Sequence, residues 1–234
     1  MDGAKRLTLS QHDRGYRYNR DSFILASFFE PHGAAAVADF CAGSGVVTAL
    51  LAVSGKGRRF VALELSPRLA ALARRNVSQS GGASVEVVVG DVMAASSLFR
   101  GRPFDAVISN PPYRKAGSGR VNPDPEKALA RHEIAMTLEG LVRAAAATLK
   151  PGGTLTVVML HARLNEYLAL LTQNGFKPAR MREVRSFAAS PPILFLLEAR
   201  LGESALDTLP PLILKSDEGG DSDEFKSLMA AYGL

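Results

Sequence analysis

The tetrapeptide Asn110-Pro111-Pro112-Tyr113 directly follows an apolar run, 104–109. Two consecutive prolines remove two backbone N–H donors and fix two φ angles, and the residue before a proline is held extended. The tetrapeptide therefore presents one amide side chain, carbonyl groups without competing N–H neighbours and one aromatic face. These groups suit a planar amine or amide, because they offer oxygen acceptors for an NH2 group and a ring to stack on it. A proline-rich turn with a packed tyrosine is the simpler alternative.

Acidic residues end three of the strands that the sequence predicts. Asp39 and Glu64 end the first and second strands, and Asp91 follows the third. A glycine-rich turn within 39–45 follows the first strand and allows close backbone approach to a ligand, as such turns also do in dinucleotide sites. Three carboxylates would repel a pyrophosphate, but they suit an ammonium, a sulfonium, a ribose diol and an adenine amine, which together describe S-adenosylmethionine. Glu64 stands roughly 20 residues past the turn, as expected for an acid that binds ribose hydroxyls. Solvated strand ends are the alternative.

The elements that position these residues alternate along the chain. A short buried strand is expected at 36–41, and further strands at 59–65, 84–90, 104–109 and 154–160. Helices are expected at 46–53, 67–77, 138–149 and 163–174. Ser66 predicts a helix N-cap and Pro67 a first helical position. Two further strands, 179–187 and 193–200, leave no room for a helix and are expected as an antiparallel pair at the sheet edge. Near-continuous apolar strands predict a parallel sheet covered on both faces, with ligands beyond its carboxyl ends.

Length and composition predict one α/β domain. The chain has 234 residues, and 47% of them are hydrophobic, enough for one sizeable core. The expected parts of the domain 1–234 are a lead-in at 1–35, a catalytic core at 36–201 and a C-terminal extension at 202–234. Mobile loops are expected at 117–125 and 202–211. No apolar run reaches the ~18 residues that span a membrane, the N-terminus lacks a secretory pattern, and the lone Cys41 excludes an internal disulfide. These features predict a cytoplasmic protein.

The charge is unevenly distributed. The chain carries a formal charge of +5, but the stretch 216–225 holds five acids and no base, which leaves +10 on the rest. A basic body with a short acidic tail suggests a polyanionic partner such as RNA, and ordinary solubilising charge is the alternative. Within the tail, we expect 225–232 to dock as a short helix.

At the glycine-rich turn, the sequence resembles the class I S-adenosylmethionine-dependent methyltransferases. The segment 39–45 is similar to their first motif, D-x-G-x-G-x-G, with Cys41 where the first glycine usually stands. The resemblance implies a Rossmann-like α/β fold with a seven-stranded, mostly parallel sheet, an antiparallel edge strand and helices on both faces. It also implies S-adenosyl-L-methionine as cofactor, with S-adenosyl-L-homocysteine as product. The implied cofactor contacts are Asp39, Cys41, Ala42, Gly43, Gly45, Glu64, Leu65, Asp91, Val92 and Asn110. Cys41 is not expected to be a nucleophile, because direct methyl transfer needs none.

The tetrapeptide 110–113 resembles the [DNS]-P-P-[YFW] motif of amino-methyltransferases. By this resemblance the catalytic residues are Asn110, Pro111, Pro112 and Tyr113. An adenine amine is a poor nucleophile because its lone pair is delocalised. Acceptance of its hydrogens by the Asn110 side-chain oxygen and the Pro111 carbonyl would favour a pyramidal nitrogen in line with the sulfonium, so that positioning and electrostatics supply most of the rate. Tyr113 would stack on an unstacked or flipped base, and no general base is required.

Outside these motifs, the sequence resembles bacterial tRNA adenine-N6 methyltransferases that modify the adenine just 3′ of the anticodon in a valine tRNA. The similar segments are 11–18, 21–26, 130–133 and the C-terminal tail. The resemblance implies that the lead-in packs over the cofactor and that Tyr18 and Asp21 help to close the site. A packed tyrosine and a helix-capping aspartate are the alternative. Basic residues that would hold tRNA phosphates, each otherwise a solvated charge, are Arg17, Arg114, Lys115, Arg120 and Arg131.

Three other functions share some of these features. Protein-glutamine N5-methyltransferases also carry Asn-Pro-Pro-Tyr, but they have a sizeable helical domain before the turn, whereas 38 residues precede Asp39 here. Guanine-N2 rRNA methyltransferases often carry a different aromatic residue and a duplicated domain. A non-catalytic RNA- or protein-binding module on the same fold is the third. No His/Cys cluster has metal-ligand spacing, so we expect no metal. We expect no membrane partner because no apolar run is long enough to span a membrane, and the oligomeric state stays open.

Overall fold

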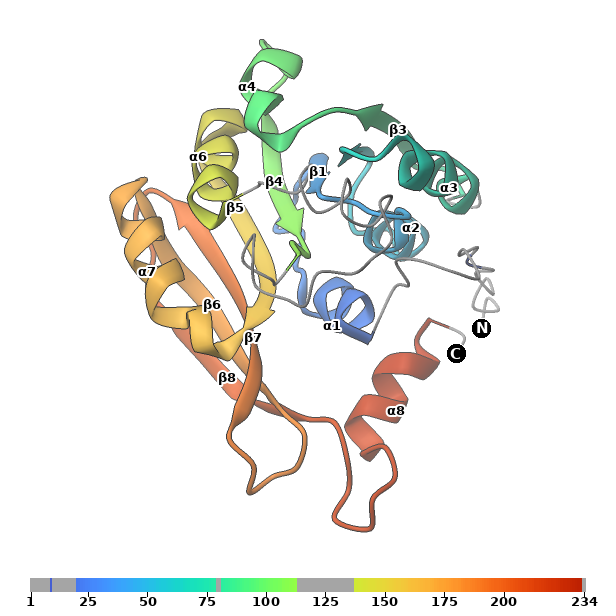
Figure 1. Cartoon of the computed structure of the whole chain (residues 1–234), viewed down its shortest axis with the longest axis vertical. Coiled ribbons are helices and arrows are strands. Elements are labelled where there is room, and N and C mark those ends of the chain that lie inside the picture. The colour runs from blue at the N-terminus through green and yellow to red at the C-terminus, as the bar shows by residue number, and fades with distance from the viewer. Residues whose placement is uncertain (1–8, 10–19, 79–80, 113–136, 233–234) are drawn as a thin grey trace, which may run out of the picture.

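The structure, a computed structural model, describes residue 9 and residues 20–78, 81–112 and 137–232. One sheet runs through the described chain in the order β3-β2-β1-β4-β5-β7-β6-β8 (Figure 1). Its strands are β1 (Ala36–Phe40), β2 (Arg59–Glu64), β3 (Ser84–Val89), β4 (Phe104–Ser109), β5 (Leu149–Leu160), β6 (Phe176–Arg185), β7 (Pro192–Leu201) and β8 (Asp207–Ile213). Neighbouring strands are parallel except where β7 pairs with β5 and β6.

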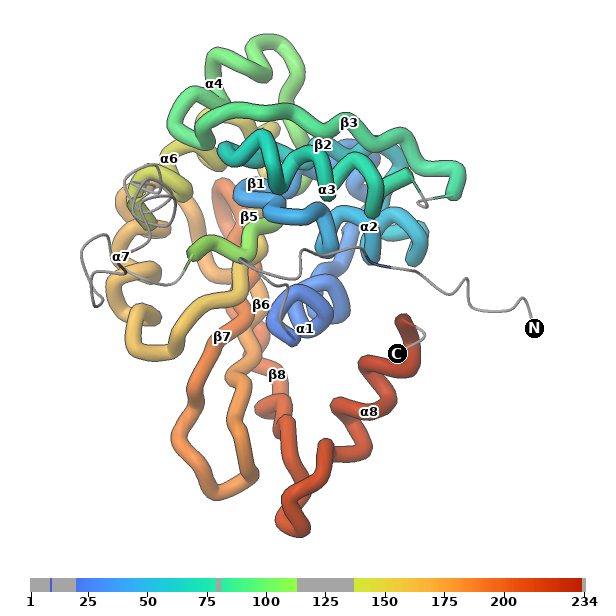
Figure 2. The backbone as a smooth tube through the Cα atoms, turned by 45° about the vertical axis from the view of Figure 1, so that its right-hand side comes forward, coloured from blue at the N-terminus to red at the C-terminus, as the bar shows by residue number. Residues whose placement is uncertain are grey.

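Helices cover both faces of this sheet. They are α1 (Arg20–Phe28), α2 (Val46–Val53), α3 (Pro67–Val77), α4 (Ala95–Leu98), α6 (Leu138–Thr148), α7 (Leu164–Gln173) and α8 (Asp223–Ala230), with 3-10 turns η1 (Val92–Ala94) and η2 (His161–Arg163). Alternate strand residues enter two separate cores, as the pleat requires. Phe40 packs with α6 and α7 on one face, and Val37 packs with α1 and α2 on the other. Helix α1 contacts both α2 and α8 and lies between them (Figures 1 and 2).

Local capping explains where several helices begin. The Ser66 hydroxyl accepts a hydrogen bond from the Leu69 amide, and Pro67 stands in the first turn of α3, which confirms the predicted start of that helix. Ser222 caps α8 in the same way. The predicted docking of the C-terminal tail is therefore confirmed by α8, whose Phe225 is fully buried.

The α/β fold class is confirmed, but the far half of the sheet differs from the prediction. The segment 202–211 was expected to be a loop, whereas 207–213 forms an eighth strand, β8, parallel to β6. The predicted antiparallel pair is confirmed by β6 and β7, but it does not end the sheet, because β8 lies outside β6 and β7 lies between β5 and β6. The hairpin between β6 and β7 reverses the chain, and β8 then covers the outer side of β6. Two prolines, Pro210 and Pro211, obscure this strand in the sequence, since proline is tolerated in a sheet mainly on an edge strand.

Other boundaries differ in smaller ways. The helix expected at 138–149 ends at Thr148, and β5 already begins at Leu149, which pairs with Phe104. Helix α1 and the short helices at 92–98 were not predicted. The expected loop at 117–125 lies outside the described residues. Within the described part of the chain, none of the helices is long and apolar enough to cross a membrane.

Candidate active site

The register of the sheet brings the predicted site residues together at the carboxyl ends of its parallel strands. Phe40 of β1 pairs with Leu63 of β2 on one side and with Ser109 of β4 on the other. Glu64 pairs in turn with Val89 of β3. The carboxyl ends of four parallel strands are therefore level, and ligands of open α/β sheets bind at such ends. The predicted residues that lie at or just after these strand ends are Asp39, Cys41, Ala42, Gly43, Gly45, Glu64, Leu65, Asp91, Val92, Asn110, Pro111 and Pro112.

The turn after β1 has the backbone conformation that its glycines suggested. Gly43 and Gly45 have φ values of 57° and 73°, and Cys41, at the place of the motif's first glycine, has a φ of 62°. A left-handed conformation at a non-glycine residue is uncommon, so Cys41 preserves the glycine-like turn at a cost in strain. A Cβ atom on Gly45 would lie 2.9 Å from the Cβ of Ala73. The turn is thus packed closely against α3.

Glu64 supports this turn directly. Its Oε2 accepts a hydrogen bond from the Gly43 amide and its Oε1 accepts one from the Ser66 amide, each at 2.8 Å. Burial raises the pKa of the carboxyl, although these amide hydrogen bonds oppose the rise. A carboxylate held between two amides has a fixed orientation. Glu64 therefore presents a preorganised acceptor at the end of β2.

Asp39 lies deeper than the sequence suggested. Only 2% of the residue is exposed, and its Oδ2 accepts hydrogen bonds from the Thr48 amide and hydroxyl, at 3.2 and 2.7 Å. Burial raises its pKa to about 7, and the charge of Glu64 adds to the rise while the Thr48 hydrogen bonds oppose it. Asp39 thus braces the first turn of α2. Its carboxyl group lies behind the turn and is only partly ionised near neutral pH.

The other residues on the cofactor side differ in exposure. Asp91 is exposed and caps η1 by accepting a 2.9 Å hydrogen bond from the Met93 amide. Leu65 is 38% exposed beside Glu64, whereas Val92 is buried. Burial, followed by the nearby charges of Glu64, Asp39 and Asp91, raises the pKa of the Cys41 thiol. That thiol stays protonated, which disfavours Cys41 as a nucleophile.

The acceptor motif begins one residue after β4. The Ser109 hydroxyl donates a 2.6 Å hydrogen bond to the Phe40 carbonyl, which joins the ends of β4 and β1. The amide Nδ2 of Asn110 donates a 3.3 Å hydrogen bond to the hydroxyl of Ser22 on α1. Pro111 is buried and Pro112 is exposed. The segment that begins at Asn110 therefore starts beside the end of β1, where the glycine-rich turn also begins.

Comparison with known proteins identifies the family. The sequence model of the methyltransferase small domain family matches residues 17–176. The chain belongs to this family. The region at the carboxyl ends of β1 to β4 is accordingly the candidate active site of a methyltransferase.

Curated relatives and solved structures agree with this assignment. A Porphyromonas gingivalis protein named tRNA1(Val) (adenine(37)-N6)-methyltransferase is 28% identical over 97% of this chain and 92% of its own length. A Bacteroides thetaiotaomicron protein of the same name is 30% identical over 73% of this chain and 77% of its own length. The crystal structure of a predicted O-methyltransferase from Agrobacterium tumefaciens has a TM-score of 0.68 and 23% identity, covering 91% of this chain and 96% of that one. That structure supports the fold alone.

Of the remaining predicted site residues of this methyltransferase, the structure describes Asp21. Asp21 lies in the first turn of α1. Outside the described residues lie Tyr18, Tyr113, Arg17, Arg114, Lys115, Arg120 and Arg131, so their roles stay predictions. Two residues of the site were missed, Ser22 and Thr48. Thr48 stands three residues after Gly45 in the first turn of α2, where a capping interaction with Asp39 could have been considered, whereas the sequence holds no signal for the contact of Ser22 with Asn110.

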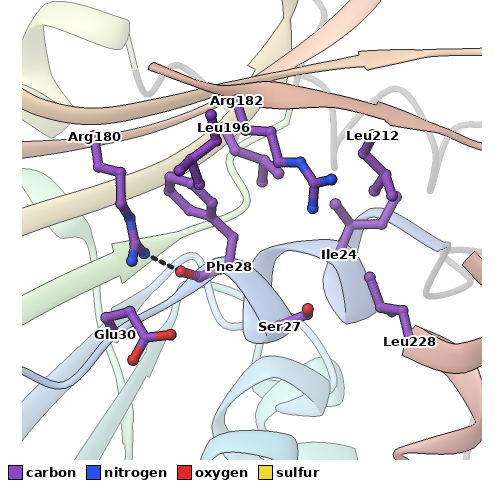
Figure 3. Close-up of a pocket in the computed structure, with 10 residues that line it drawn as sticks. Ile24, Ser27, Phe28, Glu30, Arg180, Arg182, Leu196, Leu212 and Leu228 are labelled. Atoms are coloured by element: carbon purple, nitrogen blue, oxygen red, sulfur yellow. Dashed lines mark hydrogen bonds between the residues drawn. The ribbon is translucent and has the colours of Figure 1, made fainter. Parts of the chain in front are cut away.

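A separate cavity of about 130 Å³ lies between α1, β6, β7, β8 and α8 (Figure 3). Its lining includes Phe28, Arg180 and Arg182, and it contains none of the site residues described above. Within the described ranges, no group of three or more His, Cys, Asp or Glu residues is arranged to hold a metal ion. The absence of a metal requirement stays a prediction.

Proposed function

We propose that this methyltransferase transfers a methyl group from S-adenosylmethionine to the exocyclic N6 of an adenine in tRNA, next to the anticodon of a valine tRNA. The observation that carries the proposal is the pairing of β1 with β4, because it sets Ser109, the residue before Asn110, level with Phe40, the residue before the turn at Cys41. Curated relatives named as tRNA1(Val) (adenine(37)-N6)-methyltransferases support the choice of acceptor.

The residues at the carboxyl ends of β1, β2 and β3 fit S-adenosylmethionine by their chemistry. The preorganised carboxylate of Glu64 suits a ribose diol, and the exposed carboxylate of Asp91 suits an adenine amine or a further hydroxyl. Leu65 offers an exposed apolar side chain to a ring, with Val92 and Ala42 as further contacts. A cationic ligand at the turn would favour the ionised form of Asp39 behind it. When bound there, S-adenosylmethionine supplies an electrophilic methyl group on a sulfonium and leaves as S-adenosyl-L-homocysteine.

Asn110 and Pro111 act on the acceptor amine. Their oxygens accept its two hydrogens, which places negative charge on the nitrogen and turns its lone pair toward the methyl group. Because both groups are fixed before the reaction, the gain comes from orientation and electrostatic preorganisation. Pro112 keeps the segment rigid, and Tyr113 stacks on the base. The proton leaves to solvent after transfer, so that no general base is needed.

Binding of the tRNA is assigned to the basic body of the protein. Two acidic residues of the C-terminal stretch are paired with arginines at the surface, since Asp221 contacts Arg20 and Glu224 contacts Arg182. The basic residues predicted to hold phosphates would act with the remaining positive charge. We assign the whole chain to a single methyltransferase domain, with a lead-in at 1–35, a core at 36–201 and an extension at 202–234, and we place its activity in the cytoplasm.

The class of acceptor can be tested directly. Purified protein with methyl-labelled S-adenosylmethionine would be offered, in separate reactions, unmodified valine tRNA, ribosomal RNA and a release factor. We expect label in the tRNA and close to none in the other two. Label in the release factor would favour glutamine methylation, and label in ribosomal RNA would favour guanine. Calorimetry without any heat of cofactor binding would favour a non-catalytic module.

A further inference from the structure

We propose that Ser22 of α1 is a positioning residue for methyl transfer, because its hydroxyl fixes the amide of Asn110 in the orientation that the acceptor amine needs. The proposal rests on the function proposed above for Asn110. The two residues are 88 positions apart in the sequence, and their contact exists only because the fold brings α1 to the residue that follows β4. Ser22 is 4% exposed, so that its hydroxyl is directed into the protein.

An asparagine side chain has two chemically different ends. Its oxygen accepts hydrogen bonds and its NH2 group donates them, and a half-turn of the amide exchanges the two. An acceptor amine needs the oxygen, since two NH2 groups that face each other would repel. In the structure, Nδ2 of Asn110 donates to Oγ of Ser22 at 3.3 Å. This hydrogen bond occupies the donor end and so favours the orientation in which Oδ1 acts on the substrate.

Ser22 can only fix another side chain if its own helix is fixed. At the C-terminal end of α1, the Lys56 ammonium donates to the carbonyls of Ala26, Ser27 and Phe29, at 3.1, 3.1 and 2.6 Å. Cations are favourable at this end of a helix because its last carbonyls are unsatisfied and its dipole is negative there. One side chain therefore holds three of the terminal carbonyls.

Arg180 of β6 binds the same end of the helix from the other side. Its guanidinium donates to the Phe28 carbonyl and lies 4.4 Å from the centre of the Phe28 ring (Figure 3). The buried carboxylate of Glu198 is 3.6 Å from Arg180 and keeps it in place. Lys56 and Arg180 come from different parts of the fold, so that together they limit both sliding and rotation of α1.

The N-terminal half of α1 is held by α8 and by the residues on either side of that helix. Arg20 forms a 3.2 Å ion pair with Asp221, and its guanidinium lies 5.1 Å from the centre of the Phe225 ring. Phe23 and Tyr232 are in aromatic contact at 6.1 Å. An exposed ion pair alone contributes little, but burial of Phe23 and Phe225 makes this contact apolar at its centre. Ser22 is thus carried by a helix anchored at both ends.

The test compares Ser22→Ala in two backgrounds. A single orienting hydrogen bond is expected to be worth about tenfold in rate, so Ser22→Ala should lower kcat on tRNA about tenfold. The Kd for S-adenosylmethionine, the KM for tRNA and the melting temperature should stay close to the wild-type values. Ser27→Ala is the matched control, because Ser27 lies at the other end of α1, lines the cavity in Figure 3 and keeps its main-chain carbonyl.

The second background is Asn110→Asp, which the motif permits. A carboxylate has two equivalent acceptor ends, so that a half-turn of it changes nothing. In single-turnover reactions with enzyme in excess, addition of Ser22→Ala to Asn110→Asp should therefore cost much less than in the wild type. An equal cost in both backgrounds, a wild-type kcat for Ser22→Ala, or a weakened Kd for S-adenosylmethionine in place of the loss in kcat would overturn the proposal. Failure of the wild type to methylate tRNA would instead overturn the proposed function and would be seen before any variant is made.

Discussion

The Ser109 hydroxyl donates a 2.6 Å hydrogen bond to the Phe40 carbonyl, and this bond joins the carboxyl ends of β4 and β1. The next residue on each strand begins one half of the site. Cys41 opens the glycine-rich turn, and Asn110 opens the acceptor motif. Because the two strands pair in parallel at this level, a methyl donor at the turn and an amine at Asn110 would meet without any rearrangement of the sheet. This adjacency is the physical basis for direct transfer.

Asn110→Ala should lower kcat about 100-fold or more, the usual cost of removing one preorganised hydrogen-bond partner of a transition state. The Kd for S-adenosylmethionine should be nearly unchanged, since Glu64, Asp91 and the turn are untouched. Steady-state rates and calorimetry measure the two effects separately. Asn174→Ala, at the end of α7, is a matched control that should keep the wild-type rate. A wild-type rate for Asn110→Ala would remove Asn110 from the mechanism.

Cys41→Gly should keep a kcat close to that of the wild type. The pKa of the thiol is raised by burial and by the three neighbouring carboxyl groups, so that the reactive thiolate is scarce. Glycine also accepts the positive φ of this position without strain. Methyl-transfer rates for the two proteins provide the measurement. If the loss were as large as for Asn110→Ala, Cys41 would have to take part in the reaction.

Asp39 should make the stability of the cofactor-free protein depend on pH. Its pKa is about 7 in the folded protein and about 4 in an unfolded chain, so the folded state holds the proton more tightly. The free energy of unfolding should therefore decrease as the pH rises from about 4 to about 7. In Asp39→Asn this contribution is absent. Urea unfolding at several pH values should accordingly show a shallower decrease for the variant.

Asp105 provides the control for this pH dependence. Burial alone would raise its pKa, but the hydrogen bonds from Lys150 and from the amides of Ala36 and Ala35 outweigh it and lower the pKa. The stability that Asp105 contributes is therefore lost only below about pH 4. Asp105→Asn should be less stable than the wild type but should keep its slope between pH 4 and pH 7. An unchanged slope in Asp39→Asn would contradict the assignment to Asp39.

Phe225→Ala should reduce the free energy of unfolding by about 3 kcal/mol, the lower end of the usual cost for a buried phenylalanine. The ring is fully buried beneath α8 and belongs to the core that contains α1 and α2. Lys226→Ala, which alters a neighbouring exposed side chain, should change the stability by less than about 0.5 kcal/mol. Chemical denaturation of both variants tests whether the C-terminal helix is part of the fold. Equal stabilities would show that it is not.

The sequence predicted those parts of the molecule that depend on local patterns. Ser66 and Pro67 start α3 where capping preferences place it, and Asp39, Glu64 and Asp91 stand at strand ends because each follows a short apolar run. Helix α1 was missed because it buries residues on every side, from Ser22 to Ala26, and so lacks the periodicity of a surface helix.

Long-range contacts could not be predicted in this way. The contact of Ser22 with Asn110 depends on where α1 packs, and that position is set by Lys56, Arg180 and α8. The edge strand β8 is stabilised by its pairing with β6 and not by its own strand propensity.

The central claim is that Asn110 and Pro111 bind the amine of an adenine in tRNA. The identity of the methylated product tests this claim most directly. Unmodified valine tRNA would be treated with the protein and S-adenosylmethionine, digested to nucleosides and analysed by mass spectrometry. We predict N6-methyladenosine, at one position next to the anticodon, and its loss with Asn110→Ala. Methylation of guanine, of a ribose or of adenine at another atom would contradict the claim.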